Sequence, residues 1–141
     1  MRGGSARRFV VILAAVVCLT LGGCGSRRDG GAALLLDGAA FDGGSVSPDA
    51  GDDTRVYITL DGEPLIDLPF GEAHTVTIRQ ADGSENLVSL TGEQVVMTSA
   101  NCENQDCVNM GAVTRENLEL RAMGGFIVCL PHKISVEVRG A

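Results

Sequence analysis

The chain has 141 residues, enough for one domain and an appended segment, and it carries 18 acidic against 11 basic side chains. It contains no tryptophan, one tyrosine and four phenylalanines. Such a chain has neither the positive surface that neutralises phosphates nor the aromatic rings on which bases stack, so we exclude nucleic acid as its partner.

The first 23 residues have the form of an export signal. Three arginines precede a thirteen-residue apolar run from Phe9 to Leu21, which as a helix rises only about 20 Å and falls short of a bilayer core. A Leu-Gly-Gly-Cys sequence then ends at Cys24 and resembles the cleavage motif of bacterial lipoproteins. We therefore predict cleavage before Cys24, a lipid on that residue, and attachment to the extracytoplasmic face of the cell membrane.

The net charge of the processed chain disfavours direct contact between the protein surface and the membrane. Removal of residues 1–23 takes away three arginines and leaves eight basic against 18 acidic side chains, a net charge of −10. Anionic headgroups repel such a surface, so we expect the lipid rather than the protein surface to hold the membrane.

Residues 24–53 are predicted to form a flexible tether. They are rich in glycine, aspartate, serine and alanine, and they show neither strand alternation nor a helical period. Leu34, Leu35 and Leu36 interrupt this composition. We expect these three leucines to dock on the domain or on the membrane surface.

From residue 54 to residue 141 the pattern changes to short strands with turn signals between them. Asp-Gly pairs at 61–62 and 82–83 suit tight turns, because both residue types tolerate positive φ. Apolar and polar residues alternate in most of the segments between these signals, as in strands with one buried face. The predicted strands are 56–60, 65–68, 74–78, 87–90, 94–98, 126–130 and 134–138.

One short helix is expected among the strands, from Glu103 to Met110, with Gly111 placed to end it. The segment 114–122 has no clear period and is either a loop or a short strand. The run 126–130 is continuously apolar, which is typical of a strand buried on both faces. The predicted fold class is a small all-β barrel or sandwich with one helical turn, whose marginal core would benefit from a covalent staple or a metal.

The second half of this region carries a family resemblance. In order, it has an Asn-Cys pair ending at Cys102, a Cys-Val pair starting at Cys107, Gly111, and the stretch Ile-Val-Cys-Leu-Pro-His-Lys-Ile at 127–134. Over about residues 54–138 the chain resembles the NusG domain II-like family of small secreted or membrane-anchored bacterial proteins. The resemblance implies a small β-barrel-like fold similar to the insert domain of the transcription factor NusG, and it implies no particular activity.

Three cysteines fall in the predicted domain, namely Cys102, Cys107 and Cys129. Thiols tend to oxidise outside the cytoplasm, and three of them leave one unpaired. Closing Cys102 to Cys107 or Cys102 to Cys129 is worth about 2 or about 3.5 kcal/mol, a difference too small to choose the pair. We expect a structural disulfide that involves Cys107, with its partner left open.

The same residues with His132 form a candidate metal set. Cys102, Cys107, Cys129 and His132 offer three thiolates and one imidazole, which suit tetrahedral zinc. The competing interpretations are a disulfide with a buried free cysteine, in which His132 is a loop residue, and thiol-redox chemistry at the three cysteines. His74 lies in an alternating segment and is expected to be a half-buried strand histidine.

Known catalytic signatures are absent from the sequence, which has no Gly-x-Ser-x-Gly elbow, His-Glu-x-x-His motif or phosphate-binding loop. We therefore predict a lipid-anchored, non-catalytic accessory or interaction module that uses no cofactor and contacts an unidentified protein partner. The alternative is a thiol-redox or zinc-binding protein that uses the three cysteines and His132.

Overall fold

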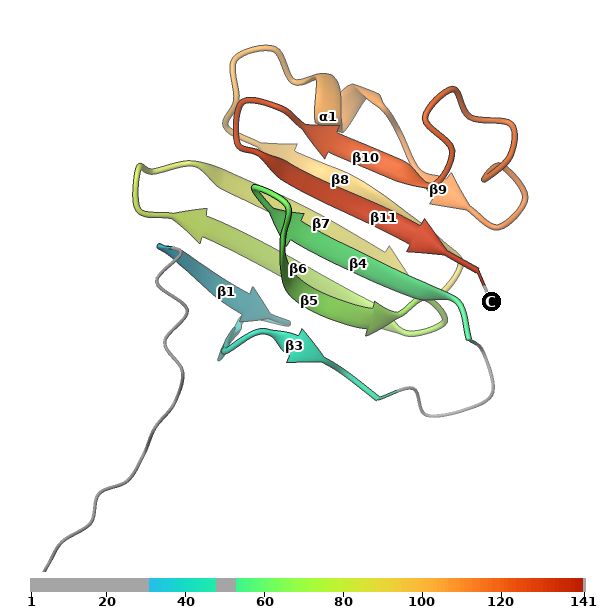
Figure 1. The fold of residues 1–141 in the computed structure, drawn as a ribbon, viewed down its shortest axis with the longest axis horizontal. Coiled ribbons are helices and arrows are strands. Elements are labelled where there is room, and N and C mark those ends of the chain that lie inside the picture. Colours follow the sequence, from blue (N-terminus) through green and yellow to red (C-terminus); the bar gives the residue numbers. More distant parts are fainter. Residues whose placement is uncertain (1–30, 48–52, 141) are drawn as a thin grey trace, which may run out of the picture.

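Two β-sheets packed face to face make up the fold (Figure 1). The computed structural model describes residues 31–47 and 53–140. The inward side chains of both sheets meet in one apolar core, as expected for strands with one buried face. The arrangement is a sandwich rather than a closed barrel, which decides between the two forms of the predicted all-β class.

Six strands form the first sheet. From edge to edge they are β2 (Ala39–Phe41), β1 (Ala32–Leu36), β6 (Ala73–Gln80), β7 (Glu85–Thr91), β8 (Gln94–Ala100) and β9 (Val113–Thr114). All neighbouring strands pair antiparallel. On β6, Val76 and Ile78 are fully buried whereas Thr75 is exposed, so the alternation in the sequence selects the face that meets the core.

Five strands form the second sheet. From edge to edge they are β10 (Phe126–Cys129), β11 (Ile134–Arg139), β4 (Arg55–Leu60), β5 (Glu63–Pro69) and β3 (Gly44–Ser45). β3 is parallel to β5, and the other pairs are antiparallel. The predicted turn between β4 and β5 is confirmed, because Asp61 and Gly62 have φ values of 51° and 84°.

Within residues 31–47 and 53–140 there is one short helix, α1 (Asp106–Asn109), which follows β8 and contacts both β8 and β10. The sequence predicted a longer helix that starts at Glu103. Gln105, however, adopts a left-handed conformation with φ 54° and ψ 18°, which a right-handed helix does not contain. The helix therefore begins only after this residue.

The prediction of a flexible tether is wrong for residues 32–45. This segment contributes β1, β2 and β3 to the two sheets, and Leu34 is buried in the common core with 8% of its surface exposed. The tether composition was misleading because β1 pairs with β6 and β3 pairs with β5, strands that lie farther along the sequence. The remaining parts of the predicted tether, 24–30 and 48–52, and the predicted signal at 1–23 lie outside the described residues.

Glycine in this segment serves close packing. Gly43 has φ 81°, and a Cβ atom at this position would lie 2.5 Å from the carbonyl oxygen of Leu65. Only glycine fits such a contact in this conformation. A glycine-rich composition therefore marks a backbone contact here, where the sequence suggested freedom of motion.

The apolar run 126–130 was predicted to be buried on both faces, and this prediction is wrong. β10 is the edge strand of its sheet, and its side chains alternate in exposure. Ile127 and Cys129 face the core, whereas Phe126 is 36% and Leu130 79% exposed. The outward apolar side chains therefore lie on the protein surface.

Candidate functional site

Three buried cysteines lie together where β8, α1 and β10 meet. Cys102 follows β8, Cys107 lies in α1, and Cys129 ends β10. Their three Sγ atoms lie within 4.8 Å of one another, and the Sγ atoms of Cys102 and Cys107 are 3.6 Å apart. None of the three residues is more than 5% exposed. The structure thus brings the three predicted cysteines together as free thiols that are near one another but not bonded.

Gln105 shapes the loop that holds two of these thiols. Its side-chain amide donates a hydrogen bond to the backbone oxygen of Ala100 at 2.6 Å, and another to the backbone oxygen of Cys102. The left-handed conformation of Gln105 turns the chain from the end of β8 into α1. This turn brings the Sγ atom of Cys107 close to the Sγ atom of Cys102, five residues earlier in the chain.

The thiol at the centre of this group is held in its neutral form. Burial raises the pKa of Cys107 to about 12, with further contributions from its contacts with Cys129 and Cys102. A free thiol with such a pKa is a poor nucleophile near neutral pH because almost none of it is thiolate. A proton-displacing ligand such as a metal would be needed to ionise it.

His132 does not join the cysteine cluster, so the predicted four-residue zinc set is wrong in its fourth ligand. His132 lies in the turn between β10 and β11, and its Nδ1–H donates to Oδ1 of Asn86 at 2.7 Å. Both residues are buried, with Asn86 fully so. The sequence places His132 three residues after Cys129, but the tight turn directs its imidazole to β7 instead.

A shallow hollow of about 270 Å³ opens above the cluster. Its wall includes the sulfur-bearing residues Cys107, Cys129, Met110 and Met123. Met123 is 49% exposed, and the neighbouring Leu130, which also lines the hollow, is 79% exposed. The wall of the hollow over these two buried thiols is thus mostly apolar and rich in sulfur, with Asn104 and Asp106 as its polar members.

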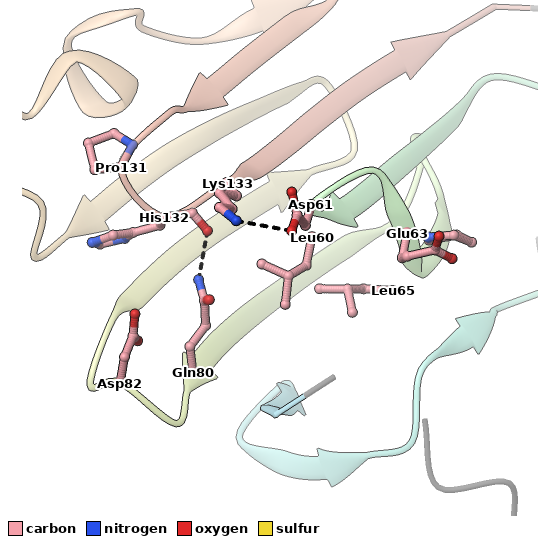
Figure 2. Close-up of a pocket in the computed structure, with 10 residues that line it drawn as sticks. Leu60, Asp61, Glu63, Leu65, Gln80, Asp82, Pro131, His132 and Lys133 are labelled. Carbon is pink, nitrogen blue, oxygen red and sulfur yellow. Dashed lines mark hydrogen bonds and ion pairs between the residues drawn. The ribbon is translucent and has the colours of Figure 1, made fainter. Parts of the chain in front are cut away.

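A larger hollow, of about 670 Å³, is lined by His132 and its neighbours in the β10–β11 turn together with residues of β4, β5 and β6 (Figure 2). Lys133 pairs with Asp61 across it at 3.0 Å, and the amide of Gln80 donates to the backbone oxygen of His132 at 2.8 Å. Its lining consists of Leu60, Asp61, Glu63, Pro64, Leu65, Gln80, Asp82, Pro131, His132 and Lys133. These contacts hold the turn that carries His132 against β4 and β6.

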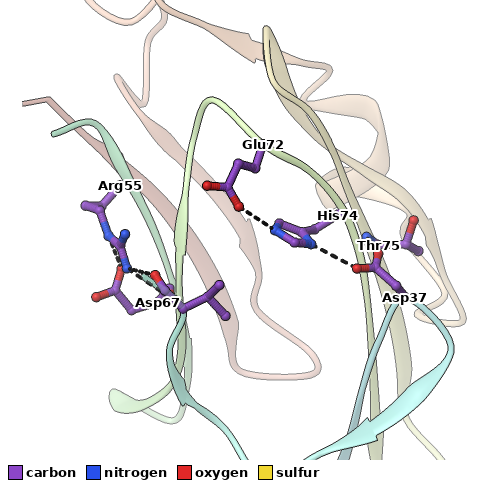
Figure 3. Close-up of polar contacts among 7 residues, drawn as sticks. Asp37, Arg55, Asp67, Glu72, His74 and Thr75 are labelled. Atoms are coloured by element: carbon purple, nitrogen blue, oxygen red, sulfur yellow. Dashed lines mark hydrogen bonds and ion pairs between the residues drawn. The ribbon is translucent and has the colours of Figure 1, made fainter. Parts of the chain in front are cut away.

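His74 is half-buried on β6, as predicted, and it bridges two carboxylates (Figure 3). Its Nδ1 lies 2.9 Å from Oδ2 of Asp37 and its Nε2 lies 3.3 Å from Oε2 of Glu72. The hydrogen bonds from His74 and from the backbone N–H of Thr75 hold the pKa of Asp37 below its usual value. This network fastens the turn between β1 and β2 to β6.

A comparison with protein families identifies the fold. The family model described as NusG domain II matches residues 10–141. The chain belongs to the NusG domain II family. The expectation drawn from the Asn-Cys, Cys-Val and Cys-Leu-Pro-His segments is thereby confirmed. No curated protein matches the sequence.

Solved structures with the same fold are similar to this NusG domain II chain. The Lin0431 protein from Listeria innocua is 27% identical, with 64% of this chain and 99% of that chain covered and a TM-score of 0.54. A DUF1312 family protein, EF3258, from Enterococcus faecalis V583 is 21% identical, with 62% and 98% covered and a TM-score of 0.54. The second likeness shows the fold alone.

Several residues of the site in this NusG domain II chain were missed by the sequence analysis. Asn86 lies on β7, Met110 follows α1 and Met123 lies between β9 and β10, so only the folded chain brings them to the cysteines and His132. Gln105 carried no recognisable turn signal, because its role depends on the carbonyls of Ala100 and Cys102.

Among the residues that the structure describes, no helix is long and apolar enough to span a membrane.

Proposed function

We propose that this NusG domain II protein is anchored by a lipid on Cys24 to the extracytoplasmic face of the cell membrane, where it serves a protein partner as a non-catalytic accessory module. The Leu-Gly-Gly-Cys sequence that ends at Cys24 supports the anchor. Cleavage there leaves a chain with a net charge of −10, for which a lipid is the effective membrane contact.

The use of the polar side chains supports a module without catalysis. Groups of the kind that act as general bases in enzymes are here tied to structural partners. His74 bridges two carboxylates between β-elements, and His132 binds Asn86 across the two sheets. Asp67 accepts a hydrogen bond from the guanidinium of Arg55, which also donates to Oγ of Ser45 in β3 and to the backbone oxygen of Val46 directly after it (Figure 3). This engagement of both described histidines in fastening strands is the observation that carries the proposal.

The anchor is tested by labelling growing cells with an alkyne analogue of palmitate and separating membranes from soluble proteins. The wild-type chain should carry the label and sediment with the membranes. Cys24→Ala should abolish the label and leave the protein unprocessed, whereas Cys18→Ala, in the same N-terminal region, should change neither. An unlabelled wild-type chain recovered in the soluble fraction with residues 1–23 still attached contradicts the proposal.

A second candidate is thiol chemistry at Cys102, Cys107 and Cys129. The approach of three Sγ atoms within 4.8 Å favours it, because two thiols at this distance form a disulfide after small side-chain rotations. Oxidation of Cys102 and Cys107 would pass two electrons and two protons to an external disulfide oxidant and leave Cys129 reduced. Intact mass after alkylation, with and without prior reduction, counts the thiols and tests this candidate directly.

A further inference from the structure

We propose that Cys102, Cys107 and Cys129 bind one cuprous ion, with the thioethers of Met110 and Met123 at the opening of the site. This goes beyond the anchored module and uses the reduced form of the three cysteines. The distances suit a single ion, since three sulfurs placed about 2.3 Å from one metal in a triangle lie about 4 Å apart. The observed Sγ separations, from 3.6 Å to a limit of 4.8 Å, bracket this value.

The donor atoms favour a soft monovalent metal. The candidate ligand group among the described residues consists of three cysteines, and the hollow above it adds two methionines. Thiolate and thioether ligands select Cu(I), whereas structural zinc takes four ligands in a tetrahedron. His132, the nearest imidazole in sequence, is committed to Asn86. The site is therefore better matched to copper than to zinc, which was one of the alternatives that the sequence left open.

Burial and access fit a metal that enters through the hollow. Cys107 and Cys129 are each 1% exposed and line the hollow, so their sulfurs lie beneath an apolar opening. Met110 lies close to β10, where its Sδ accepts the backbone N–H of Val128 at 3.3 Å. Met123 is exposed, and its unbranched side chain is free to bring a sulfur over the opening.

Binding exchanges protons for metal and involves no electron transfer. Each coordinating thiol releases its proton to solvent as the Cu(I)–sulfur bond forms, so the affinity should increase with pH. The copper must arrive already reduced. A bound ion also stabilises the folded state, because the unfolded chain does not hold the three sulfurs together.

The test uses the full-length chain in detergent with Cys18→Ser and Cys24→Ser, so that only the three domain thiols remain. The protein is reduced, its thiols are counted by alkylation and mass, and it is titrated without oxygen with Cu(I) against a chromophoric cuprous chelator. We expect one Cu(I) per chain, a higher unfolding temperature with copper, and sulfur-only coordination by copper-edge X-ray absorption.

Variants separate the ligands from the fold. Loss of a residue that only supports a metal ligand lowers metal affinity by about 10–100-fold. Cys107→Ser removes a ligand and should weaken Cu(I) binding by more than this. Met123→Leu should weaken it by about tenfold. Met123 is exposed, so its replacement leaves the core intact. Met97→Leu is the matched control, because Met97 is a buried thioether that packs beside Asn86 and should leave binding unchanged.

Three results would overturn the copper site. The first is a chain with three counted thiols that leaves all Cu(I) on the chelator. The second is equal binding in wild type and Cys107→Ser, and the third is retention of stoichiometric zinc against equimolar Cu(I). None of these outcomes bears on the anchor, which is read from the acylation of Cys24 alone.

Discussion

His132 and Asn86 form a buried hydrogen bond that joins the two sheets. Nδ1–H of His132, in the turn between β10 and β11, donates to Oδ1 of Asn86 on β7 at 2.7 Å. The amide nitrogen of Asn86 in turn lies 3.5 Å from Sδ of Met97, as its donor. A histidine that the sequence offered as a metal ligand therefore supports the packing of the sandwich.

Removal of the Asn86 side chain should destabilise the fold. Asn86→Ala leaves the buried N–H of His132 without its acceptor, which costs about 1–3 kcal/mol in the free energy of unfolding. Urea unfolding followed by circular dichroism measures the loss. Asn109→Ala, at an exposed position of α1, is the control and should change stability by less than about 0.5 kcal/mol. Equal effects of the two substitutions would contradict the structural role of the bond.

Leu34 tests whether β1 belongs to the folded domain. Leu34→Ala removes a side chain that is only 8% exposed and packs in the core, so it should cost about 2 kcal/mol or more in the free energy of unfolding. Leu35→Ala, at the adjacent half-buried position that faces the other way, should cost less. A flexible tether would instead show no loss for either variant in urea unfolding.

Arg55 should control the attachment of β3. Its guanidinium donates to Oδ1 of Asp67 at 2.7 Å and to the backbone oxygen of Val46 at 2.8 Å, contacts that a lysine cannot make together. Arg55→Lys should lower the free energy of unfolding by about 1 kcal/mol and speed amide exchange at Val46.

The matched control for Arg55 is Arg79→Lys. Arg79 pairs with Glu85 through side chains that are 57% and 46% exposed, so its replacement should change stability little. Hydrogen-exchange mass spectrometry of the peptide that contains Val46 compares the two variants. Unchanged protection in Arg55→Lys would show that β3 is held by its backbone pairing alone.

Cys107 should make stability depend on alkaline pH. Its pKa is raised from 9.0 to about 12 because burial disfavours the thiolate, while the unfolded chain ionises near the ordinary value. The stability that the neutral, buried thiol of Cys107 contributes is fully present below about pH 9 and is lost as the pH rises toward 12. Metal-free, reduced protein should therefore lose stability in urea between neutral pH and about pH 10. Cys107→Ala should lose less over the same interval, and parallel slopes would refute the assignment.

Local signals predicted the strands. Asp61-Gly62 marked the β4–β5 turn because both residues accept positive φ, and alternation marked β6 because one of its faces is buried. Such features depend on neighbours in sequence, which is why they are visible before folding.

Features that depend on distant partners were not predictable in this way. Asp37-Gly38 forms a turn with φ values of 51° and 82°, but the strand before it is held in the sheet by its pairing with the distant β6. Burial of Leu34 depends on pairing with β6, about 40 residues later. The direction of the His132 ring depends on Asn86, which is 46 residues away. Each of these outcomes is decided by tertiary contacts rather than by local propensity.

Because β1 belongs to the first sheet, few residues remain between the folded domain and the proposed lipid anchor on Cys24. Only the seven residues 25–31 separate Cys24 from β1, so an acylated Cys24 would lie at most roughly 28 Å from Ala32. Ala32 pairs with Gln80, whose amide binds the backbone oxygen of His132, at the pole of the sandwich where β8 ends and the cysteines begin. With the proposed anchor, the end of the sandwich that carries the cysteines is also the end to which the anchored segment attaches, so a partner in the membrane is within reach of the sulfur atoms.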